Sequence, residues 1–180
     1  MTLREKYIKQ VMPKMKKKFG YKNDLAVPKI EKVVINVGLN VDQTSKDPKF
    51  QEIVEKTLRQ ISGQEPAKKL AKKSISGFKI REGQLVGLTV ILRGQRMYDF
   101  IEKLINITLP RTRDFRGLEK KSLDKNGNLN IGFKEHTVFP EIDPNEVEKT
   151  HGLEVVIVTT AKDREESLEL FKLLGFLFRE

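Results

Sequence analysis

Two segments of this chain alternate apolar and polar residues, and this alternation constrains the fold more than any other feature. Side chains two residues apart on a β-strand point to the same face of the sheet. One face is apolar in residues 29–38 and in residues 85–93, through Val33, Ile35 and Val37 and through Val86, Leu88, Val90 and Leu92. Each segment therefore predicts a strand with one buried face. The opposite faces should emerge together, and they carry Lys32, Asn36, Gly87, Thr89 and Arg93.

The other periodic segments predict helices and shorter strands around these two. Apolar residues recur at helical spacing in residues 2–19, 47–63, 95–109 and 163–175. Strand patterns lie near residues 128–133 and 155–160, and Asn126-Gly127 is a two-residue hairpin signal before the first of them. We expect an α+β fold with a single domain over residues 1–180, in which about five mostly antiparallel strands are backed by about four helices.

Single residues mark where the helices should begin and end. Helix caps are predicted at Thr2 with Glu5, at Asp47-Pro48 and at Asp163 with Glu166. Pro13 falls within the first helical pattern, so a kink or a short first segment is expected there. Pro110 should end the third helix, because the residue before a proline disfavours the helical conformation.

The charge of the chain is large and unevenly placed. Lys and Arg number 35 against 25 Asp and Glu, which gives a formal net charge of +10. Residues 1–22 hold 8 basic and 1 acidic side chains and residues 66–125 hold 15 and 6, whereas residues 126–180 hold 6 and 11. Two basic blocks and an acidic one predict that the molecule binds a polyanion through one part of its surface and not through another.

Two basic segments are candidates for that contact. Residues 67–83 are too charged for a core element and should form a flexible projection, which either orders on nucleic acid or stays a solvated loop. The second segment runs from Arg111 to Gly117 and places three guanidinium groups around Phe115. Arginine binds phosphate bidentately and stacks on bases, so RNA contact is favoured over a brace in which Asp114 pairs with an arginine and Phe115 joins the core.

Few residues could support catalysis or a metal. The chain has no Cys and 2 His, and each of His136 and His151 is expected at the surface or in a turn. The acidic cluster after Pro140 lacks the glycine and the alternating ligands of a calcium loop. We expect no enzyme, no cofactor, no metal and no membrane-spanning segment. Two alternatives remain open: an RNA hydrolase using Glu141, Asp143 and His136, and a basic protein–protein adaptor.

Five motifs resemble one family along nearly the whole chain. They are Lys72-Lys73-Ser74-Ile75-Ser76-Gly77-Phe78, Leu92-Arg93-Gly94-Gln95-Arg96-Met97, Leu109 to Gly117, Phe139-Pro140-Glu141-Ile142 and Val158-Thr159-Thr160-Ala161. Their order is similar to that in the bacterial-type large-subunit ribosomal proteins that bind 5S ribosomal RNA, called L-five. The resemblance implies a structural, monomeric protein of the central protuberance, in a cytoplasmic ribosome or an organellar one.

The same resemblance, with the alternation above, assigns contacts to residues. Binding of 5S RNA is expected at Lys32, Asn36, Gln64, Thr89 and Arg93, and binding of large-subunit RNA at Arg111, Arg113, Phe115 and Arg116. A loop facing the P-site tRNA is implied at Lys72, Lys73, Ser74, Phe78 and Lys79. A bridge to a small-subunit head protein is implied at Glu141, Asp143 and Glu146. The chain departs from the family pattern at Leu123 to Leu129, at Gly83 to Gly87 and at Lys68-Lys69.

Overall fold

The computed structural model describes residues 1–39, 49–113 and 115–179, and the Asp47-Pro48 cap and Asp114 lie outside them. It contains a five-stranded sheet of order β2-β3-β1-β5-β4. The strands are β1 (Ile30–Gly38), β2 (Ala67–Leu70), β3 (Leu85–Leu92), β4 (Leu129–Phe133) and β5 (Leu153–Thr159). Leu39 N, just after β1, donates to Val86 O near the start of β3, and Thr160 N, just after β5, donates to Lys29 O just before β1, each at 2.9 Å. The end of one strand thus lies beside the start of its neighbour, so β1 is antiparallel to both β3 and β5. The α+β prediction is confirmed.

Contacts group the residues into two compact units. Unit 1 comprises Met1–Val33, Leu92–Ile131 and Val156–Glu180, and unit 2 comprises Val34–Ile91 and Gly132–Val155. The single domain expected from the sequence stays a prediction. No helix of the described residues is long and apolar enough to cross a membrane.

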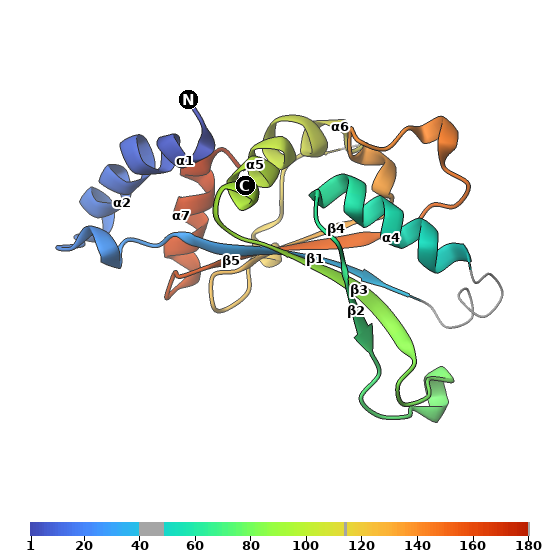
Figure 1. The fold of residues 1–180 in the computed structure, drawn as a ribbon. Helices are drawn as coiled ribbons and strands as arrows, with labels where there is room; N and C mark the ends of the chain where they lie inside the picture. The colour runs from blue at the N-terminus through green and yellow to red at the C-terminus, as the bar shows by residue number, and fades with distance from the viewer. Residues whose placement is uncertain (40–48, 114, 180) are drawn as a thin grey trace. The chain divides into compact units, whose positions relative to one another are not determined.

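The long helix among the described residues of unit 2 is α4 (Lys49–Ser62), which lies along its part of the sheet (Figure 1). Residues three and four apart share a helix face, and this face buries Phe50, Val54, Leu58 and Ile61. The sheet contributes Ile35, Val37, Leu88 and Val90, all at most 2% exposed. Gly63 ends the helix with a φ of +65°, a conformation that glycine adopts without steric cost. The alternation in β1 and β3 thus predicted the buried face correctly.

The projection is partly a strand. β2 pairs with β3 in antiparallel register, Ala67 opposite Thr89 and Lys68 opposite Leu88, with an irregularity between Lys69 and Leu70. The expectation that residues 67–83 form a loop is therefore wrong for the first four. Lysines on a short edge strand are a common protection against pairing with other chains, so their charge does not exclude a strand.

Unit 1 contains three helical bodies, two of which include a π-helical turn before a proline. The first joins α1 (Leu3–Lys6), the π-helical η1 (Tyr7–Val11) and α2 (Met12–Phe19), and the second joins α5 (Gly94–Lys103), the π-helical η4 (Leu104–Thr108) and α6 (Leu109–Arg111). Each π-helical turn ends two residues before Pro13 or Pro110. Proline lacks the N–H that an α-helix requires, and the wider turn accommodates this. The irregularity at Pro13 is confirmed, while Pro110 does not end its helix.

The third helical body of unit 1 is α7 (Arg164–Leu174), which contacts η1 and α2. Asp163 precedes it, but its side chain accepts no capping bond, so the predicted cap is wrong in this detail. Glu166 Oε2 instead accepts a hydrogen bond from Lys162 N at 3.0 Å. The capping box of Thr2 and Glu5 at α1 is confirmed.

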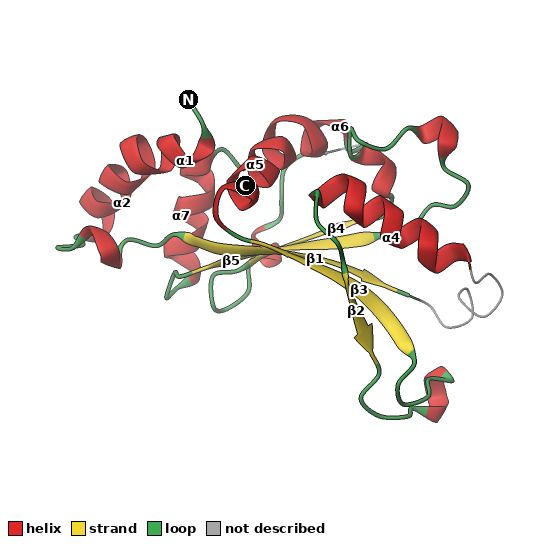
Figure 2. Cartoon of the chain, viewed as in Figure 1, coloured by secondary structure: helices red, strands yellow, loops and turns green. Residues whose placement is uncertain are grey.

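Short 3₁₀ turns connect these elements (Figure 2). They are η2 (Asp24–Ala26), η3 (Ser76–Phe78), η5 (Lys120–Ser122), η6 (His136–Val138) and η7 (Pro144–Glu146). The hairpin at Asn126-Gly127 differs from the expected two-residue turn, because the bridge that closes it joins Leu123 to Leu129. The Asp124 carboxylate holds this wider turn by accepting bonds from the backbone N–H groups of Asn126 and Asn128 at 2.9 and 2.7 Å.

Candidate nucleic-acid interface

The centre of the candidate interface is a pair of polar side chains on the half-buried face of β1 and β3 in unit 2. Thr89 Oγ1 donates a hydrogen bond to Asn36 Oδ1 at 2.9 Å. Neither residue is sealed in the core, since both are only partly buried. Among the described residues, no group accepts a hydrogen bond from the Asn36 Nδ2 amide. The pair therefore presents unused donors and acceptors to the outside.

Gly87 places no side chain on this face of the sheet beside the Asn36–Thr89 pair. A Cβ atom at position 87 would lie 2.9 Å from Val37 O, a separation that real Cβ atoms essentially never show. Glycine is therefore required by the close approach of the β1 backbone. The surface around Asn36 and Thr89 is small and flat as a result.

Gln64 lies in the same unit, beside the C-terminal end of β3. Its backbone N–H donates to Ser62 Oγ at 3.2 Å, and its Nε2 donates to Ile91 O at 3.3 Å. Arg59 and Glu65 brace the turn through two hydrogen bonds of 2.6 Å. These bonds to the guanidinium lower the pKa of the Glu65 carboxyl. The structure thus brings Gln64 to the strand that carries Thr89.

Lys32 and Arg93 fall in unit 1, so their place on the same surface as Asn36 stays a prediction. Arg93 is exposed at the start of α5, and its Nη1 lies 3.3 Å from Glu31 Oε1. An exposed ion pair of this kind contributes about 0–1 kcal/mol. Glu31 therefore holds Arg93 only weakly.

The tip of the β2–β3 hairpin combines lysines with exposed apolar side chains. Lys72, Lys73, Ser74, Phe78 and Lys79 are all exposed, and Phe78 is 72% exposed. The tip has regular internal bonds, because Ile75 and Ile80 exchange two backbone hydrogen bonds of 2.9 and 3.1 Å. The backbone N–H of Glu82 also donates to Ser74 Oγ at 2.9 Å. An exposed aromatic ring among cations can stack on an unpaired base.

The arginine loop lies in unit 1 after α6. Arg111, Arg113 and Arg116 are exposed, and Phe115 is half-buried. The C-terminal segment anchors the far end of this loop: Leu118 N donates to Leu177 O, and Arg179 N donates to Leu118 O, each at 2.8 Å. The sequence analysis missed this anchor, because no local pattern links residues so far apart in the chain; Gly117 beside it has a φ of +101°.

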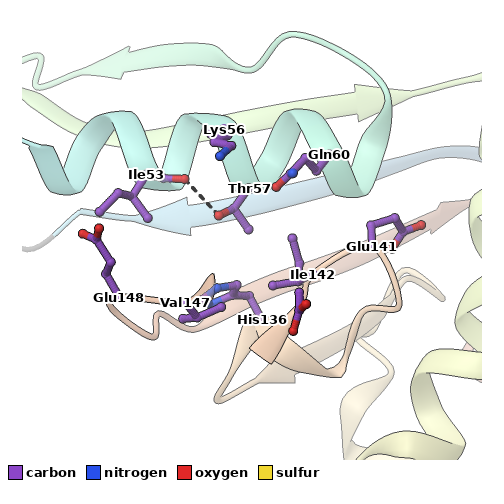
Figure 3. A pocket seen from close by; sticks show the side chains of 10 residues that line it. Ile53, Lys56, Thr57, Gln60, His136, Glu141, Ile142, Val147 and Glu148 are labelled. Atoms are coloured by element: carbon purple, nitrogen blue, oxygen red, sulfur yellow. Dashed lines mark hydrogen bonds between the residues drawn. The ribbon is translucent and has the colours of Figure 1, made fainter. Parts of the chain in front are cut away.

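Two acidic residues of the expected bridge, Glu141 and Asp143, line a cavity of about 210 Å³ in unit 2 (Figure 3). Its walls are α4 and the segment after β4, which contribute Ile53, Lys56, Thr57, Gln60, His136, Glu141, Ile142, Asp143, Val147 and Glu148. Asp143 caps η7 by accepting the Asn145 N–H at 2.9 Å. The side chain of Glu146 lies outside the described part of the structure. Within the described part, no three acidic or histidine side chains group as a metal site.

The two histidines are buried, which corrects the expectation of surface positions. His136 and His151 are 1% and 7% exposed, and their rings stack with centroids 4.1 Å apart. The His151 backbone N–H donates to His136 Nδ1 at 3.2 Å. Burial lowers the pKa of both rings, that of His151 to about 4, and the neighbouring His136 charge adds to the effect on His151. No local pattern indicates that the two rings are buried, because they meet only when the chain between residues 136 and 151 folds back on itself.

Comparison with known proteins decides the family. The model described as Ribosomal protein L5 matches residues 23–81, and a second model, described as the C-terminus of the same ribosomal family, matches residues 85–178. This chain belongs to the ribosomal protein L5 family. It is 50% identical over 179 residues to the large ribosomal subunit protein uL5 of Halothermothrix orenii, covering 99% of each chain. It is 51% identical over 177 residues to that of Syntrophomonas wolfei, covering 98% of each.

Membership of the L5 family bears on the enzyme alternative. The cavity does bring Glu141, Asp143 and His136 together, as a hydrolase would require. The relatives, however, are ribosomal structural proteins, which are not enzymes. The expectation that this chain is not an enzyme is therefore confirmed by its relatives.

Proposed function

We propose that this protein is a structural constituent of the large ribosomal subunit that binds 5S ribosomal RNA through the polar face of β1 and β3. The observation that carries the proposal is the Asn36–Thr89 pair, hydrogen-bonded at 2.9 Å on a partly buried sheet face. The large-subunit names of its relatives support the assembly. The protein acts as a monomer in the cytoplasmic ribosome.

The mechanism of binding follows from the shape and chemistry of that face. The minor groove of an RNA helix is wide and shallow and displays 2′-hydroxyl groups and base edges. A flat surface with an amide, a hydroxyl and the close backbone approach at Gly87 can lie against it. Asn36 Nδ2 donates to RNA oxygens while its Oδ1 keeps the bond to Thr89. Gln64, Lys32 and Arg93 extend the contact toward neighbouring sugars and phosphates.

The other surfaces take further partners in the central protuberance. The hairpin tip, with Lys72, Lys73, Ser74, Phe78 and Lys79, contacts the P-site tRNA through phosphates and stacking. Arg111, Arg113, Phe115 and Arg116 bind large-subunit RNA. Glu141, Asp143 and Glu146 bridge to a basic head protein of the small subunit. Each assignment is supported by exposure of the described side chains, except that Phe115 is half-buried.

The test is a double-mutant cycle on 5S RNA affinity with Asn36→Ala and Thr89→Ala. Each change should weaken binding about 2- to 10-fold, since a net hydrogen bond contributes about 0.5–1.5 kcal/mol. The two changes should be non-additive because the side chains are bonded to each other. Asn106→Ala and Thr150→Ala are matched controls at exposed positions and should leave binding unchanged. Unchanged affinity in both single variants, with native circular dichroism, would remove the sheet face from the interface.

A further inference from the structure

We propose that the N-terminal helical body, Leu3–Phe19 with the following Lys22, is a second RNA-binding surface that takes the phosphate backbone of double-stranded RNA. The inference rests on the proposed function, since it takes the partner to be ribosomal RNA. Its starting point is the concentration of 8 basic and 1 acidic side chains in residues 1–22. None of the contacts proposed above uses this block.

The structure separates the lysines of this block into two groups. Lys16 Nζ lies 2.5 Å from Asp24 Oδ1, and Lys18 Nζ lies 2.7 Å from Glu169 Oε2 on α7. Lys16 thus pairs with the turn η2 and Lys18 with α7, both in the same unit. In the described part of the chain, no carboxylate pairs with the exposed Lys9, Lys14, Lys17 and Lys22.

The unpaired lysines lie on the outward side of the helix. Its buried row is Leu3, Tyr7, Val11 and Met15, and Met15 is fully buried. At about 100° per residue, Lys14 and Lys17 project well away from Met15 and only about 60° from each other. Side chains three residues apart are neighbours, with Cβ atoms about 5–6 Å apart. The helix therefore offers a compact outward-facing cationic pair rather than scattered charges.

A purely structural role explains only part of this arrangement. Cations in the last turn of a helix interact favourably with its dipole, and Lys16, Lys17 and Lys18 occupy the last turn of α2 before Gly20. Lys9 and Lys14 lie before that turn. Lys14 and the likewise unpaired Lys17 are three residues apart, a spacing at which like charges destabilise a helix by a few tenths of a kcal/mol. Such a repulsion is expected of residues that bind an anion.

The double variant Lys14→Gln/Lys17→Gln tests the inference on the full chain. The probe is a short blunt-ended RNA duplex of arbitrary sequence, and binding is followed by fluorescence anisotropy over rising KCl. Each lost phosphate contact should lower the magnitude of the slope of log K against log salt by about 0.9, and the pair by about 2. The thermal midpoint should stay the same or rise. Lys162→Gln/Lys172→Gln, two exposed lysines of the same unit, is the charge-matched control.

The outcomes separate this inference from the sheet-face proposal. A wild-type slope in the double variant overturns the inference, and so does an equal loss in the Lys162/Lys172 control, which would show only a response to net charge. A lower slope with a stable fold supports it. Asn36→Ala removes no charge, so it should keep the wild-type salt slope even where it weakens affinity. Failure of the sheet-face proposal would appear instead as unchanged 5S RNA affinity in that variant.

Discussion

Acidification should destabilise this protein well before its carboxylates dominate the titration, because of the buried histidine stack. Burial lowers the pKa of His151 from its ordinary 6.5 to about 4. The folded protein therefore binds a proton at the His151 ring only at a lower pH than the unfolded chain does. Stability is fully present above about pH 6.5 and is lost as the pH falls toward about 4. A difference of about 2.5 pKa units corresponds to about 3 kcal/mol, and His136 adds to the loss in the same direction.

Urea unfolding followed by circular dichroism, at intervals between about pH 7 and about pH 4, measures this loss. His151→Phe is the comparison, because it keeps a flat ring beside His136 and Phe50 and removes both the titration and a buried Nε2 that lacks a partner among the described residues. The variant should lose less stability than the wild type as the pH falls. Parallel loss in both proteins would refute the reasoning. His151→Asn gives a second comparison if the larger ring does not fit.

Three further changes test other parts of the structure. Gly87→Ala should lower the stability measured by urea unfolding by about 1–3 kcal/mol through its clash with Val37 O, and an unchanged midpoint would contradict the close approach. Thr108→Val should stabilise by about 1 kcal/mol, because it removes a buried hydroxyl without a partner in the described part of the chain; a lower midpoint would show an unseen bond. Deleting residues 178–180 should speed hydrogen exchange at 115–119 and weaken large-subunit RNA binding, whereas unchanged exchange would dismiss the C-terminal anchor.

The strands and the polar face could be predicted because their information is local. Alternation in β1 and β3 fixes which side chains are buried, and both Asn36 and Thr89 emerged on the half-buried side. The capping box at Thr2 and the helix ends at Gly20 and Gly63 depend on residues close in sequence. Such features require no knowledge of distant contacts.

Features that depend on distant partners could not be predicted. β2 is a strand because β3 supplies its hydrogen bonds, although its four residues are exposed and half of them are lysines. His136 and His151 are buried because β4 and β5 bring them together from 15 residues apart. The anchor of Leu118 comes from the C-terminal segment, and no periodicity links the two. In each case tertiary contact overrides the local pattern.

The most direct test of the sheet-face interface is an NMR titration of the side-chain amide of Asn36 and the methyl group of Thr89 with 5S RNA. The account predicts that both signals shift or broaden at stoichiometric RNA, and that the amide protons of Asn36 become protected from solvent exchange. Unchanged signals from both residues, while lysine signals elsewhere respond to the same RNA, would contradict it.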